Sequence, residues 1–469
     1  MIAHDKEQFD DRYQYAFRQK HSTLDSILLA RHDIEKNLDM GNYVLAIFLD
    51  LSLAFDSVNI HSILPQKIKH YGGNPTTVNF FKSFFNNRTH IIDWNGTHSK
   101  ENDLFDISVC QGSVLGPVCF NKYISCYKNL INGDWDDKVN NDCNPASSSD
   151  GKTDKSKYSS KCNGTLFADD IQLTISSKCP IELFKRGNSV LEKTRRYMDS
   201  NELILNGKKT QYILFRPNGK KNVTINESLT VKDQVIDRVK SAKYLGVCFD
   251  EDLNFNEHFR QVKSKLKEAV KALICTRLTL NYRCKILLYN SSFKPFIEYC
   301  CIAFLDKISK VKINELFILQ KQAIRLIFNA KRNVHTSKLF ELSGIIPITK
   351  LYEVESIKMV YKYKFDPAFG ELPIAIRELI NLPSTNSNRL YNDQNKIKIP
   401  SEYKKGHCFY NIIDCWNNCD PNLKMAGNLY SLKKMIKEEF PKATSTCNVI
   451  NCKICQLDLG KNYGYYMTK

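Results

Sequence analysis

The chain has 469 residues, 42% of them hydrophobic, so it is long enough for two or three folded units with cores of their own. No apolar run approaches the ~18 residues that a membrane-spanning helix needs, so we expect no membrane protein. Its 17 cysteines are an odd number and lie mostly inside apolar runs. They favour free thiols in a reducing intracellular compartment, the nucleus or the cytoplasm, over a disulfide framework.

The positive charge of the chain is unevenly placed. Lys and Arg outnumber Asp and Glu by 68 to 50, which gives a net charge of +18. Residues 258–335 alone hold sixteen Lys and Arg against four Asp and Glu, so this stretch contributes most of the excess. A concentrated basic region is typical of proteins that bind a polyanion, most often a nucleic acid. A solvated helix face and an acidic membrane surface remain as alternatives.

The first half of the chain predicts a mixture of helices and strands. A helix over residues 20–40 has Ser22 and Asp25 as capping candidates. The apolar run over residues 44–51 predicts a strand that is buried on both faces. The other predicted elements are, in chain order, helices over 61–71, 76–85 and 118–130, a hairpin over 164–177, a helix over 183–198 and strands over 203–205 and 212–215. This order favours an α+β fold with helices packed on one face of an antiparallel sheet.

Two regions depart from this alternation. Residues 132–163 are rich in Asn, Asp, Ser and Lys and carry almost no aliphatic side chains, which predicts a flexible insertion. From Phe255 onward the pattern is helical, and two apolar stripes at helical spacing predict surfaces that face a core. The stripes consist of Phe259, Val262, Leu266, Ala269, Val270 and Leu273, and of Leu316, Leu319, Ala323, Ile324 and Ile327.

Three carboxylates point to chemistry. Asp169 and Asp170 are adjacent within the predicted hairpin, and Asp50 ends the apolar run over residues 43–50. Like charges side by side repel each other unless a cation lies on them, and Mg²⁺ takes hard oxygen ligands of this kind. Two strands whose carboxylates meet suggest two-metal phosphoryl or nucleotidyl transfer, with the metals roughly 3.5–4 Å apart. For any one aspartate at a strand end, a helix cap or a turn is the plainer alternative.

Six segments, in chain order, resemble the motifs of reverse transcriptases, and in particular those of non-LTR (LINE-type, Jockey-like) retrotransposons. Five resemble motifs A to E of the family, and the first is similar to a segment that precedes motif A in non-LTR elements. They are residues 15–23 (YAFRQKHST), 48–58 (FLDLSLAFDSV), 110–120 (CQGSVLGPVCF), 165–170 (TLFADD), 205–210 (LNGKKT) and 243–247 (KYLGV). Each motif is weak by itself, but their shared order leaves little room for chance.

The resemblance implies an RNA-directed DNA polymerase that adds dNTPs to a DNA primer on an RNA template. Asp50, Asp169 and Asp170 would hold two Mg²⁺ ions, or Mn²⁺, which lower the pKa of the primer 3′-hydroxyl and neutralise the triphosphate. Lys209 would act as a general acid toward the leaving pyrophosphate, with a solvated turn lysine as the alternative.

The resemblance also implies nucleotide and primer contacts. Phe55 would exclude a 2′-hydroxyl beneath the sugar, with a core aromatic as the alternative. Gln111 and Gly112 would lie near the incoming nucleotide, where glycine allows a close approach of the backbone. The implied primer contacts are Phe167, beneath the primer end, and a tight hairpin made of Tyr244, Leu245 and Gly246.

The implied architecture is a right-hand polymerase palm, an antiparallel sheet with helices, accompanied by partial fingers. Residues 1–250 would form the fingers and palm, with the insertion over 132–163 between them. Residues 251–345 would form a basic helical thumb that follows a nucleic-acid duplex through its phosphates. Residues 346–469, beyond the stretch of about residues 12–345 that the motifs cover, would form a C-terminal helical region of the family type.

Departures from the family pattern leave a rival function open. Cys110 replaces the proline that usually precedes the Gln-Gly pair, which removes a rigid φ angle. The fingers segments that usually precede residue 15 are not seen, so we expect a fragment or a degenerate copy of a longer reading frame. The rival is a polymerase relic that binds nucleic acid without incorporating nucleotides. An unrelated two-metal nuclease is a third class, but it would not explain the Gln-Gly turn or the Tyr-Leu-Gly hairpin.

The cysteines near the end of the chain suggest part of a zinc knuckle. Cys447, Cys452 and Cys455 have suitable spacing, but no fourth Cys or His follows them, and a structural zinc takes four ligands. Free thiols are therefore favoured over a metal site. The same holds for a preceding group without recognised spacing, which consists of His407, Cys408, Cys415 and Cys419.

Overall fold

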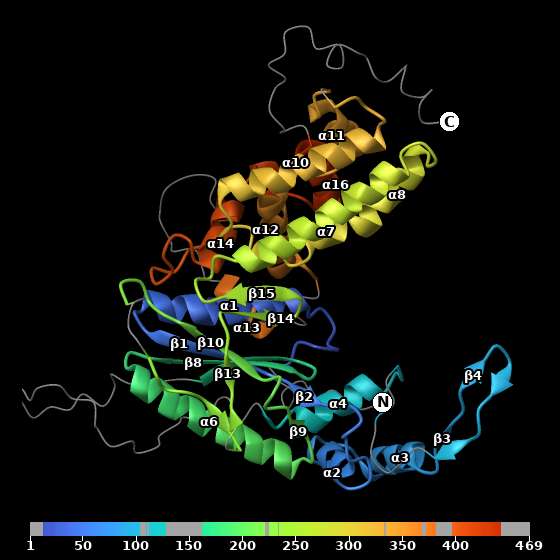
Figure 1. The fold of residues 1–469 in the computed structure, drawn as a ribbon, viewed down its shortest axis with the longest axis vertical. Coiled ribbons are helices and arrows are strands. Elements are labelled where there is room, and N and C mark those ends of the chain that lie inside the picture. Colours follow the sequence, from blue (N-terminus) through green and yellow to red (C-terminus); the bar gives the residue numbers. More distant parts are fainter. Residues whose placement is uncertain are drawn as a thin grey trace, which may run out of the picture. The chain divides into compact units, whose positions relative to one another are not determined.

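The computed structural model describes residues 13–103, 109, 112–127, 162–220, 225–232, 234–332, 334–367, 372–380 and 396–441. The chain divides into two compact units, Met1–Gly246 and Val247–Lys469, and each is described by itself. In Figure 1, helices and a sheet build the first unit, and helices dominate the second. The division of residues 251–469 at residue 345 stays a prediction.

The first unit holds the main sheet and the helices around it. Its described helices are α1 (Thr23–Asp39), α2 (Ile63–His70), α3 (Pro75–Phe85), α4 (Gly116–Ile124) and α6 (Pro180–Ser200). Its longer strands are β1 (Tyr43–Leu49), β7 (Cys162–Phe167), β8 (Asp170–Ser177), β10 (Gln211–Phe215) and β14 (Ser241–Tyr244). Its two-residue strands are β2 (Leu51–Ser52), β3 (Thr89–His90), β4 (Asp93–Trp94), β5 (Thr97–His98), β6 (Asn102–Asp103), β9 (Ile204–Leu205), β11 (Thr230–Val231), β12 (Gln234–Val235) and β13 (Asp237–Arg238).

The main sheet has five strands in the order β13-β10-β1-β8-β7. The strand β1 lies at its centre and pairs antiparallel with both β8 and β10. The strands β7 and β8 form an antiparallel hairpin, and β13, at the edge, runs parallel to β10. Because Leu49 at the end of β1 faces Ile171 at the start of β8, the end of β1 and the tip of the hairpin lie at the same edge of the sheet.

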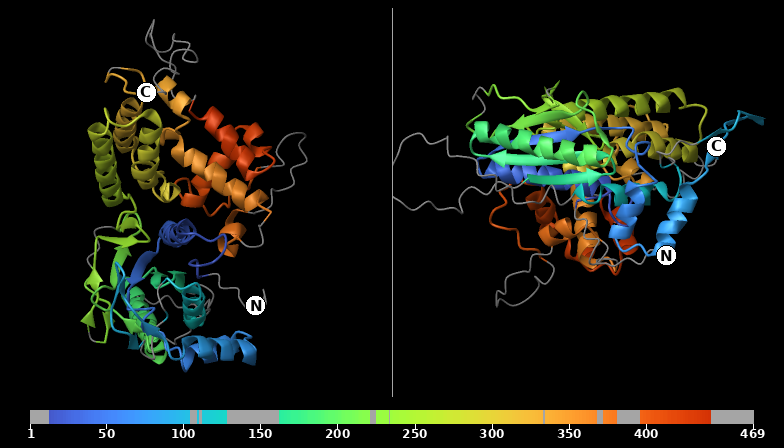
Figure 2. Two further views of the ribbon diagram at one scale, coloured as in Figure 1. Left: turned by 90° about the vertical axis from the view of Figure 1, so that its right-hand side faces the viewer. Right: turned by 90° about the horizontal axis from the view of Figure 1, so that it is seen from below.

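Helices cover both faces of this sheet. The helix α1 contacts β1, β7 and β8, and α6 contacts β1, β8 and β11. Figures 1 and 2 show α1 in dark blue and α6 in green on opposite sides of the strands. All residues of β1 are therefore buried, as its continuous apolar run predicts. The prediction that the helices pack on one face is wrong, because an apolar stripe shows that a helix has a core side but not which face of the sheet it covers.

Local signals explain where α1 begins and ends. The Asp25 carboxylate accepts hydrogen bonds from the backbone N–H and the hydroxyl of Ser22, both at 2.8 Å, which completes a capping box. After the helix, Gly41 has a φ of +78° and its N–H donates to the carbonyl of Leu38. The helix predicted over residues 20–40 is confirmed, with both proposed capping residues in place.

The other elements predicted for this unit are present with shifted ends. The helices predicted over 61–71, 76–85 and 118–130 correspond to α2, α3 and α4, the predicted hairpin to β7 and β8, and the helix over 183–198 to α6. Most of the predicted insertion, residues 132–161, lies outside the described residues. Its last two residues are not part of a loop, because Cys162 and Asn163 pair with Ile175 and Thr174 in the hairpin.

The second unit is helical, as the pattern after Phe255 predicts. Its elements are β15 (Val247–Asp250), α7 (Asn256–Cys275), α8 (Tyr282–Ser292), α9 (Lys294–Glu298), a 3₁₀ turn (Cys301–Ala303), α10 (Lys310–Ile327), α11 (Ser337–Ser343), α12 (Ile348–Phe365), α13 (Ile374–Ile380), α14 (Cys408–Asn418), α15 (Pro421–Lys424) and α16 (Leu429–Glu439). Among the described residues of both units, none of the helices has the length and apolar character that crossing a bilayer requires.

The two predicted apolar stripes lie on α7 and α10, which pack together. Every residue of the first stripe is buried. In the second, Leu319 is partly exposed and Gln320 is buried instead. The amide of Gln320 donates to the Tyr289 hydroxyl at 3.0 Å and accepts from the Ile348 N–H at 2.9 Å. A polar residue can therefore occupy a core position because its hydrogen bonds are satisfied, which hydrophobic spacing does not reveal.

The close approach of α6 to the sheet generates a prediction. A Cβ atom built on Gly187 would lie 2.6 Å from Cδ2 of Leu229 and 3.2 Å from Cδ1 of Leu45. Alanine gains ~1 kcal/mol of helix propensity over glycine, which offsets a small shift of Leu229. The larger Gly187→Val substitution overpacks the contact and should lower the free energy of unfolding by ~1–3 kcal/mol in urea titrations. Lys185→Ala, at an exposed position of the same helix, is the control. Equal stability of Gly187→Val and the unmodified protein would contradict this packing.

Candidate active site

A two-residue turn places the adjacent aspartates at the tip of the β7–β8 hairpin. Phe167 pairs with Asp170, which leaves Ala168 and Asp169 as the central residues of the turn. The φ of Ala168 is +57°, and Asp169 is not among the residues with positive φ, which is the pattern of a type II′ turn. A non-glycine residue in this region costs roughly 1–2 kcal/mol, so the surrounding contacts must hold the turn in place.

The third aspartate reaches the same edge from the centre of the sheet. Asp50 follows β1 directly, and one more step of the β1–β8 register sets it opposite Asp170. Its carbonyl accepts from the Asn206 N–H at 2.9 Å, and its own N–H donates to Oγ1 of Thr210 at 3.3 Å. Three segments that are far apart in sequence, residues 48–58, 165–170 and 205–210, therefore lie together at this edge of the sheet.

The charges of the three carboxylates act on one another. The pKa of Asp169 is raised mainly by partial burial of its carboxylate, and the negative charge of Asp50 raises this pKa further. The pKa of Asp170 is raised to about 6, first by burial and then by the charges of Asp169 and Asp50. Mutual repulsion of this kind is expected where a cation is normally shared.

One oxygen of Asp50 has an environment that suits a metal ion. Its Oδ2 atom is buried, and no described residue gives it a hydrogen bond. Among the described residues, the nearest cation is Nζ of Lys209, 4.0 Å away, on a side chain that is 71% exposed. One exposed ammonium at this distance does not neutralise three carboxylates, whereas a divalent ion takes oxygen ligands of this type. The donor set therefore fits a divalent metal.

The turn that carries Lys209 is fixed beside Asp50. The short strands β2 and β9 pair Leu51 with Leu205, directly before that turn. Within it, the side chain of Asn206 accepts from the N–H of Lys209 at 3.2 Å. The structure thus places Lys209 beside Asp50, and its role as a general acid stays a prediction.

Gln14 supports the hairpin, although no pattern in the sequence predicted this role. Its buried Oε1 atom accepts two backbone N–H groups, those of Ala16 and Ala168, both at 3.0 Å. Tyr15 also donates its N–H to the carbonyl of Leu166 in β7 at 2.9 Å. These bonds tie the segment before α1 to the strained turn at Ala168. The sequence offered no signal for Gln14 beyond its place beside the motif at residue 15.

Phe55 lies in an aromatic cluster. Its ring is partly exposed and stacks on the buried ring of Phe120, with centroids 4.6 Å apart and an angle of 22°. The ring of Phe17 meets it edge-on at 6.3 Å. Packing therefore fixes one side of Phe55, as the core alternative predicts, while part of the ring remains accessible, as a contact with a sugar requires.

The segment predicted to lie near the nucleotide is only partly described. Cys110 and Gln111 lie outside the described residues. Gly112 is exposed, has a φ of +88°, and would place a Cβ in open space. Glycine is therefore suited to position 112 because the backbone there has a φ angle that L-residues rarely adopt, and not because a neighbour packs closely against it.

The predicted primer hairpin has two different parts. Leu245 and Gly246 both have positive φ, +46° and +85°, the pattern of a type I′ turn, and Gly246 is exposed. The side chain of Tyr244 is instead buried, and its hydroxyl contacts Oγ of Ser26 at 2.8 Å and Oγ1 of Thr165 at 3.0 Å. Burial is also the main cause that raises the pKa of this phenol. Tyr244 therefore anchors the turn from inside the first unit.

The remaining site residues are placed as follows. Phe167 is partly exposed at the end of β7 and packs against the core. His407, Cys408, Cys415 and Cys419 lie in the helical second unit, and Cys447, Cys452 and Cys455 lie outside the described residues. The described cysteines carry free thiols.

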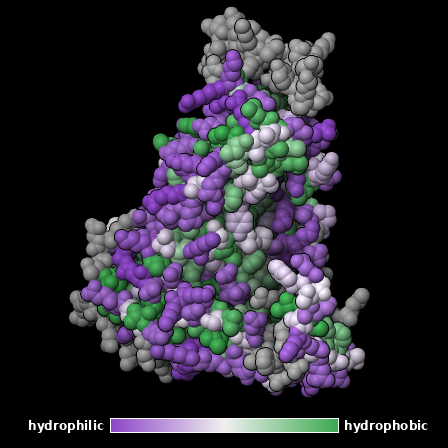
Figure 3. Space-filling view, turned by 45° about the vertical axis from the view of Figure 1, so that its right-hand side comes forward, coloured by the Kyte–Doolittle hydropathy of each residue, from purple (hydrophilic) through white to green (hydrophobic). Residues whose placement is uncertain are grey.

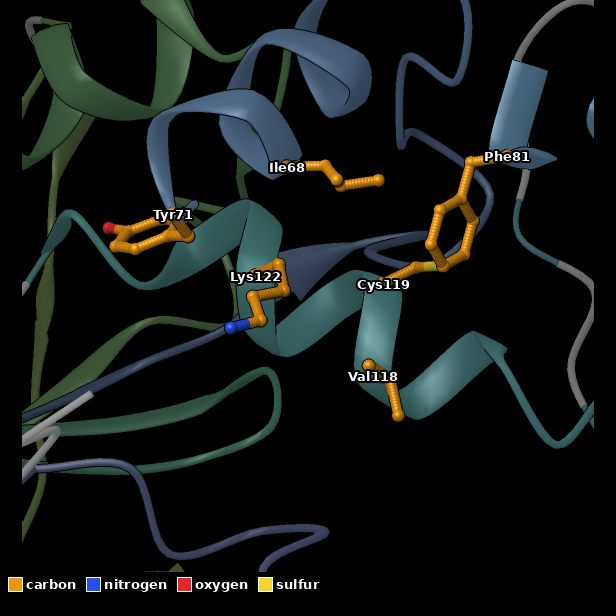
Figure 4. A pocket seen from close by; sticks show the side chains of 6 residues that line it. All are labelled: Ile68, Tyr71, Phe81, Val118, Cys119 and Lys122. Carbon is orange, nitrogen blue, oxygen red and sulfur yellow. The ribbon is translucent and has the colours of Figure 1, made fainter. Parts of the chain in front are cut away.

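The pocket in Figure 4 is not this site. It lies between α2, α3 and α4 and has a volume of about 10 Å³, which is room for about one water molecule. Its lining consists of Ile68, Tyr71, Phe81, Val118, Cys119 and Lys122. A ligand of nucleotide size does not fit there, and the carboxylates lie on other elements.

The repulsion among the carboxylates generates a prediction for the metal-free protein. Since its folded pKa is raised, the Asp170 carboxyl loses folding stability as the pH rises from about 4, its unfolded value, to about 6. Asp170→Asn should therefore be more stable than the unmodified protein at pH 7 in EDTA, and Mg²⁺ should raise its melting temperature less. Asp56→Asn, at an exposed position of the same motif, is the control. A destabilised Asp170→Asn in EDTA would contradict the repulsion.

The buried hydroxyl of Tyr244 generates a second prediction. Tyr244→Phe removes its contacts with Ser26 and Thr165 and should lower the free energy of unfolding by ~1 kcal/mol in urea titrations. Tyr430→Phe removes a hydroxyl from a side chain that is 78% exposed and should change nothing measurable. If both variants are equally stable, the hydroxyl of Tyr244 does not anchor the turn.

Comparisons with known proteins point to one family. The family model described as "Reverse transcriptase (RNA-dependent DNA polymerase)" matches residues 1–249. The "Probable RNA-directed DNA polymerase from transposon BS" of Drosophila melanogaster is 25% identical over 318 residues, which cover 67% of this chain and 32% of that protein. The "RNA-directed DNA polymerase from mobile element jockey" of the same organism is 24% identical over 327 residues, 68% of this chain and 32% of that protein.

This chain thus spans about a third of the length of these relatives. A solved structure of telomerase from Candida albicans aligns with a TM-score of 0.29 and 10% identity, over 82% of this chain and 56% of that chain, and so loose a superposition supports no argument. The family model, in contrast, matches more than half of the chain. The chain therefore belongs to the reverse transcriptase (RNA-dependent DNA polymerase) family, and its relatives confirm the resemblance to LINE-type retrotransposons.

Proposed function

We propose that this chain carries the polymerase site of a LINE-type reverse transcriptase, which copies an RNA template by adding dNTPs to a DNA primer. The observation that carries the proposal is the meeting of Asp50 with Asp169 and Asp170 from two strands of one sheet. The family match supports the class of reaction, and the names of the relatives support an RNA template. Because the chain spans about a third of the Drosophila relatives, the activity of the whole protein is part of the proposal.

The three aspartates would hold two divalent ions, Mg²⁺ or Mn²⁺. The buried Oδ2 of Asp50 supports this assignment, because no described residue gives that oxygen a hydrogen bond. When bound, the ions would lower the pKa of the primer 3′-hydroxyl and neutralise the triphosphate. The hairpin register and the bonds of Gln14 hold the aspartates in a fixed arrangement, which reduces the cost of assembling the site.

In the reaction, the primer 3′-oxygen forms a bond to the α-phosphorus while the bond to the pyrophosphate oxygen breaks. Lys209, 4.0 Å from Asp50 and mostly exposed, is free to turn toward the leaving group and give it a proton or a positive charge. The exposed part of Phe55 would select against a 2′-hydroxyl, since the stack on Phe120 prevents the ring from moving aside. Gln111 and Gly112 would border the base or sugar of the incoming nucleotide.

The primer would meet the exposed turn at Leu245 and Gly246, with Phe167 beneath its end. Tyr244 would act through this turn and not by touching the primer, since its ring and hydroxyl are buried. We assign the main sheet with α1 and α6 to the palm, and α2, α3 and α4 to partial fingers. The basic helices from α7 to α10 would form the thumb, which follows the duplex through its phosphates.

Primer extension on an RNA template with Mg²⁺ tests this function. Asp169→Asn and Asp170→Asn together should lower the extension rate by at least ~100-fold, because the loss of metal ligands removes several kcal/mol of transition-state stabilisation. Asp237→Asn, at an exposed position on the edge strand β13, should extend the primer normally.

The same assay separates the rival functions. Extension that survives the double substitution would contradict the assigned site. An unmodified protein that binds an RNA–DNA hybrid with steep salt dependence but extends nothing would be the nucleic-acid-binding relic. Cleaved template or primer in place of extended primer would identify a nuclease.

A further inference from the structure

Phe17 has a backbone conformation that does not suit its side chain. Its φ is +56°, in the left-handed region that glycine enters easily and bulky residues rarely adopt. The residue before it is fixed on two sides. The Ala16 N–H donates to Oε1 of Gln14 at 3.0 Å, and the Ala16 carbonyl accepts from Nδ2 of Asn121 at 2.9 Å. These bonds hold the chain at Phe17 in its strained conformation.

Folding alone does not explain a phenylalanine at this position. The side chain is 55% exposed, so the burial of its apolar surface contributes little to stability. Glycine would adopt the same backbone angle with less strain. Figure 3 shows hydrophobic side chains at several places among hydrophilic ones, so exposure by itself marks no functional site. A strained backbone and an exposed ring at one residue are together typical of a functional position.

The ring of Phe17 contacts the ring of Phe55. The two rings meet edge-on, with centroids 6.3 Å apart and an angle of 86°. The buried ring of Phe120 instead stacks on Phe55, with centroids 4.6 Å apart and an angle of 22°. Because the two neighbours meet Phe55 at different angles, they restrain its ring in different directions.

The segment that carries Phe17 is tied to the turn that carries the aspartates. Oε1 of Gln14 accepts the N–H of Ala168 as well as that of Ala16, both at 3.0 Å. Since the side chain of Gln14 is buried, water does not compete for these bonds. One amide oxygen thus joins the backbone beside Phe17 to the turn that presents Asp169.

We propose that Phe17 is a positioning residue for the choice between deoxyribonucleotides and ribonucleotides. It holds the Phe55 ring against sideways movement, so that the exposed part of this ring stays where a 2′-hydroxyl would lie. Without Phe17, the Phe55 ring tilts into the vacated space and the pocket for the sugar admits the hydroxyl. The inference rests on the proposed function for the reaction itself, and it adds a second residue to the selection of the sugar.

The test compares primer extension by the full chain with dCTP and with CTP on the same primed RNA template. The readout is the ratio of the two kcat/KM values, because a loss of folded protein lowers both values equally. We expect Phe17→Ala to lower the preference for dCTP by about 3- to 10-fold, which is the range of one aromatic contact. Phe17→Tyr, which keeps the ring, should stay within about 2-fold of the unmodified protein.

Phe80→Ala is the matched control. Phe80 is 53% exposed on α3, and its ring stacks on Phe84. This variant loses a phenylalanine of the same exposure as Phe17 and should leave the ratio unchanged. An unchanged ratio in Phe17→Ala, or an equal change in Phe80→Ala, would overturn the proposal.

A double-mutant cycle separates positioning from direct contact with the nucleotide. In the Phe55→Ala background, Phe17→Ala should change the ratio by less than about 2-fold, because the ring that Phe17 positions is gone. Equal effects of Phe17→Ala with and without the Phe55 ring would contradict the positioning role, since they point to a contact between Phe17 and the nucleotide.

Thermal melting gives a readout that requires no catalysis. Phe17→Gly loses the ring contact but relieves the left-handed angle, so its melting temperature should stay within about 3 °C of that of the unmodified protein. A larger fall would show that Phe17 serves folding and would overturn the proposal. An unmodified protein that extends no primer with dCTP would instead defeat the proposed function, so the two failures are distinguishable.

Discussion

Repulsion between three carboxylates at one edge of a sheet is the constraint on which the rest of the first unit depends. Asp50 closes the central strand, and the β7–β8 register sets Asp169 and Asp170 beside it. Within the described part of the chain this repulsion is not relieved, since Lys209 lies at the limit of an ion pair with Asp50. Burial and hydrogen bonding elsewhere must therefore stabilise a site that is unfavourable until cations bind. The contacts of Gln14 and Tyr244 belong to that support.

The local negative charge stands out because the chain as a whole is strongly basic, with a net charge of +18. A basic chain attracts polyanions over its whole surface. This attraction weakens as the salt concentration rises, and it does not determine where on the protein a polyanion binds. The acidic cluster, in contrast, repels phosphates unless cations are present. The two effects together bring a nucleic acid to the protein while making the chemistry at the sheet edge conditional on metal ions.

The role of a residue in the fold or the site could be predicted where a local sequence pattern specifies it. The aspartates, the helix α1 with its capping box and the buried strand β1 were all predicted, because short spacing and apolar runs specify them. The presence of helices on both faces of the sheet was not predicted, because the face on which α1 packs depends on contacts between residues that are far apart in sequence. Tyr244 was expected at the primer, but its side chain is buried and its hydroxyl contacts Ser26 and Thr165, which lie far away in sequence. Gln14 was missed for the same reason, since its partner Ala168 is 154 positions distant.

The left-handed conformation of Ala168 has a consequence for the drift of related copies of this sequence. With a φ of +57°, this position penalises most L-residues, above all the β-branched ones, and accepts glycine or asparagine best. A copy that acquires valine or threonine there would distort the tip that presents Asp169 while keeping every acidic residue intact. Such a copy would retain all of its recognisable motifs and yet have lost its geometry. Inventories of mobile elements that judge competence by the aspartate pair alone would count it as intact.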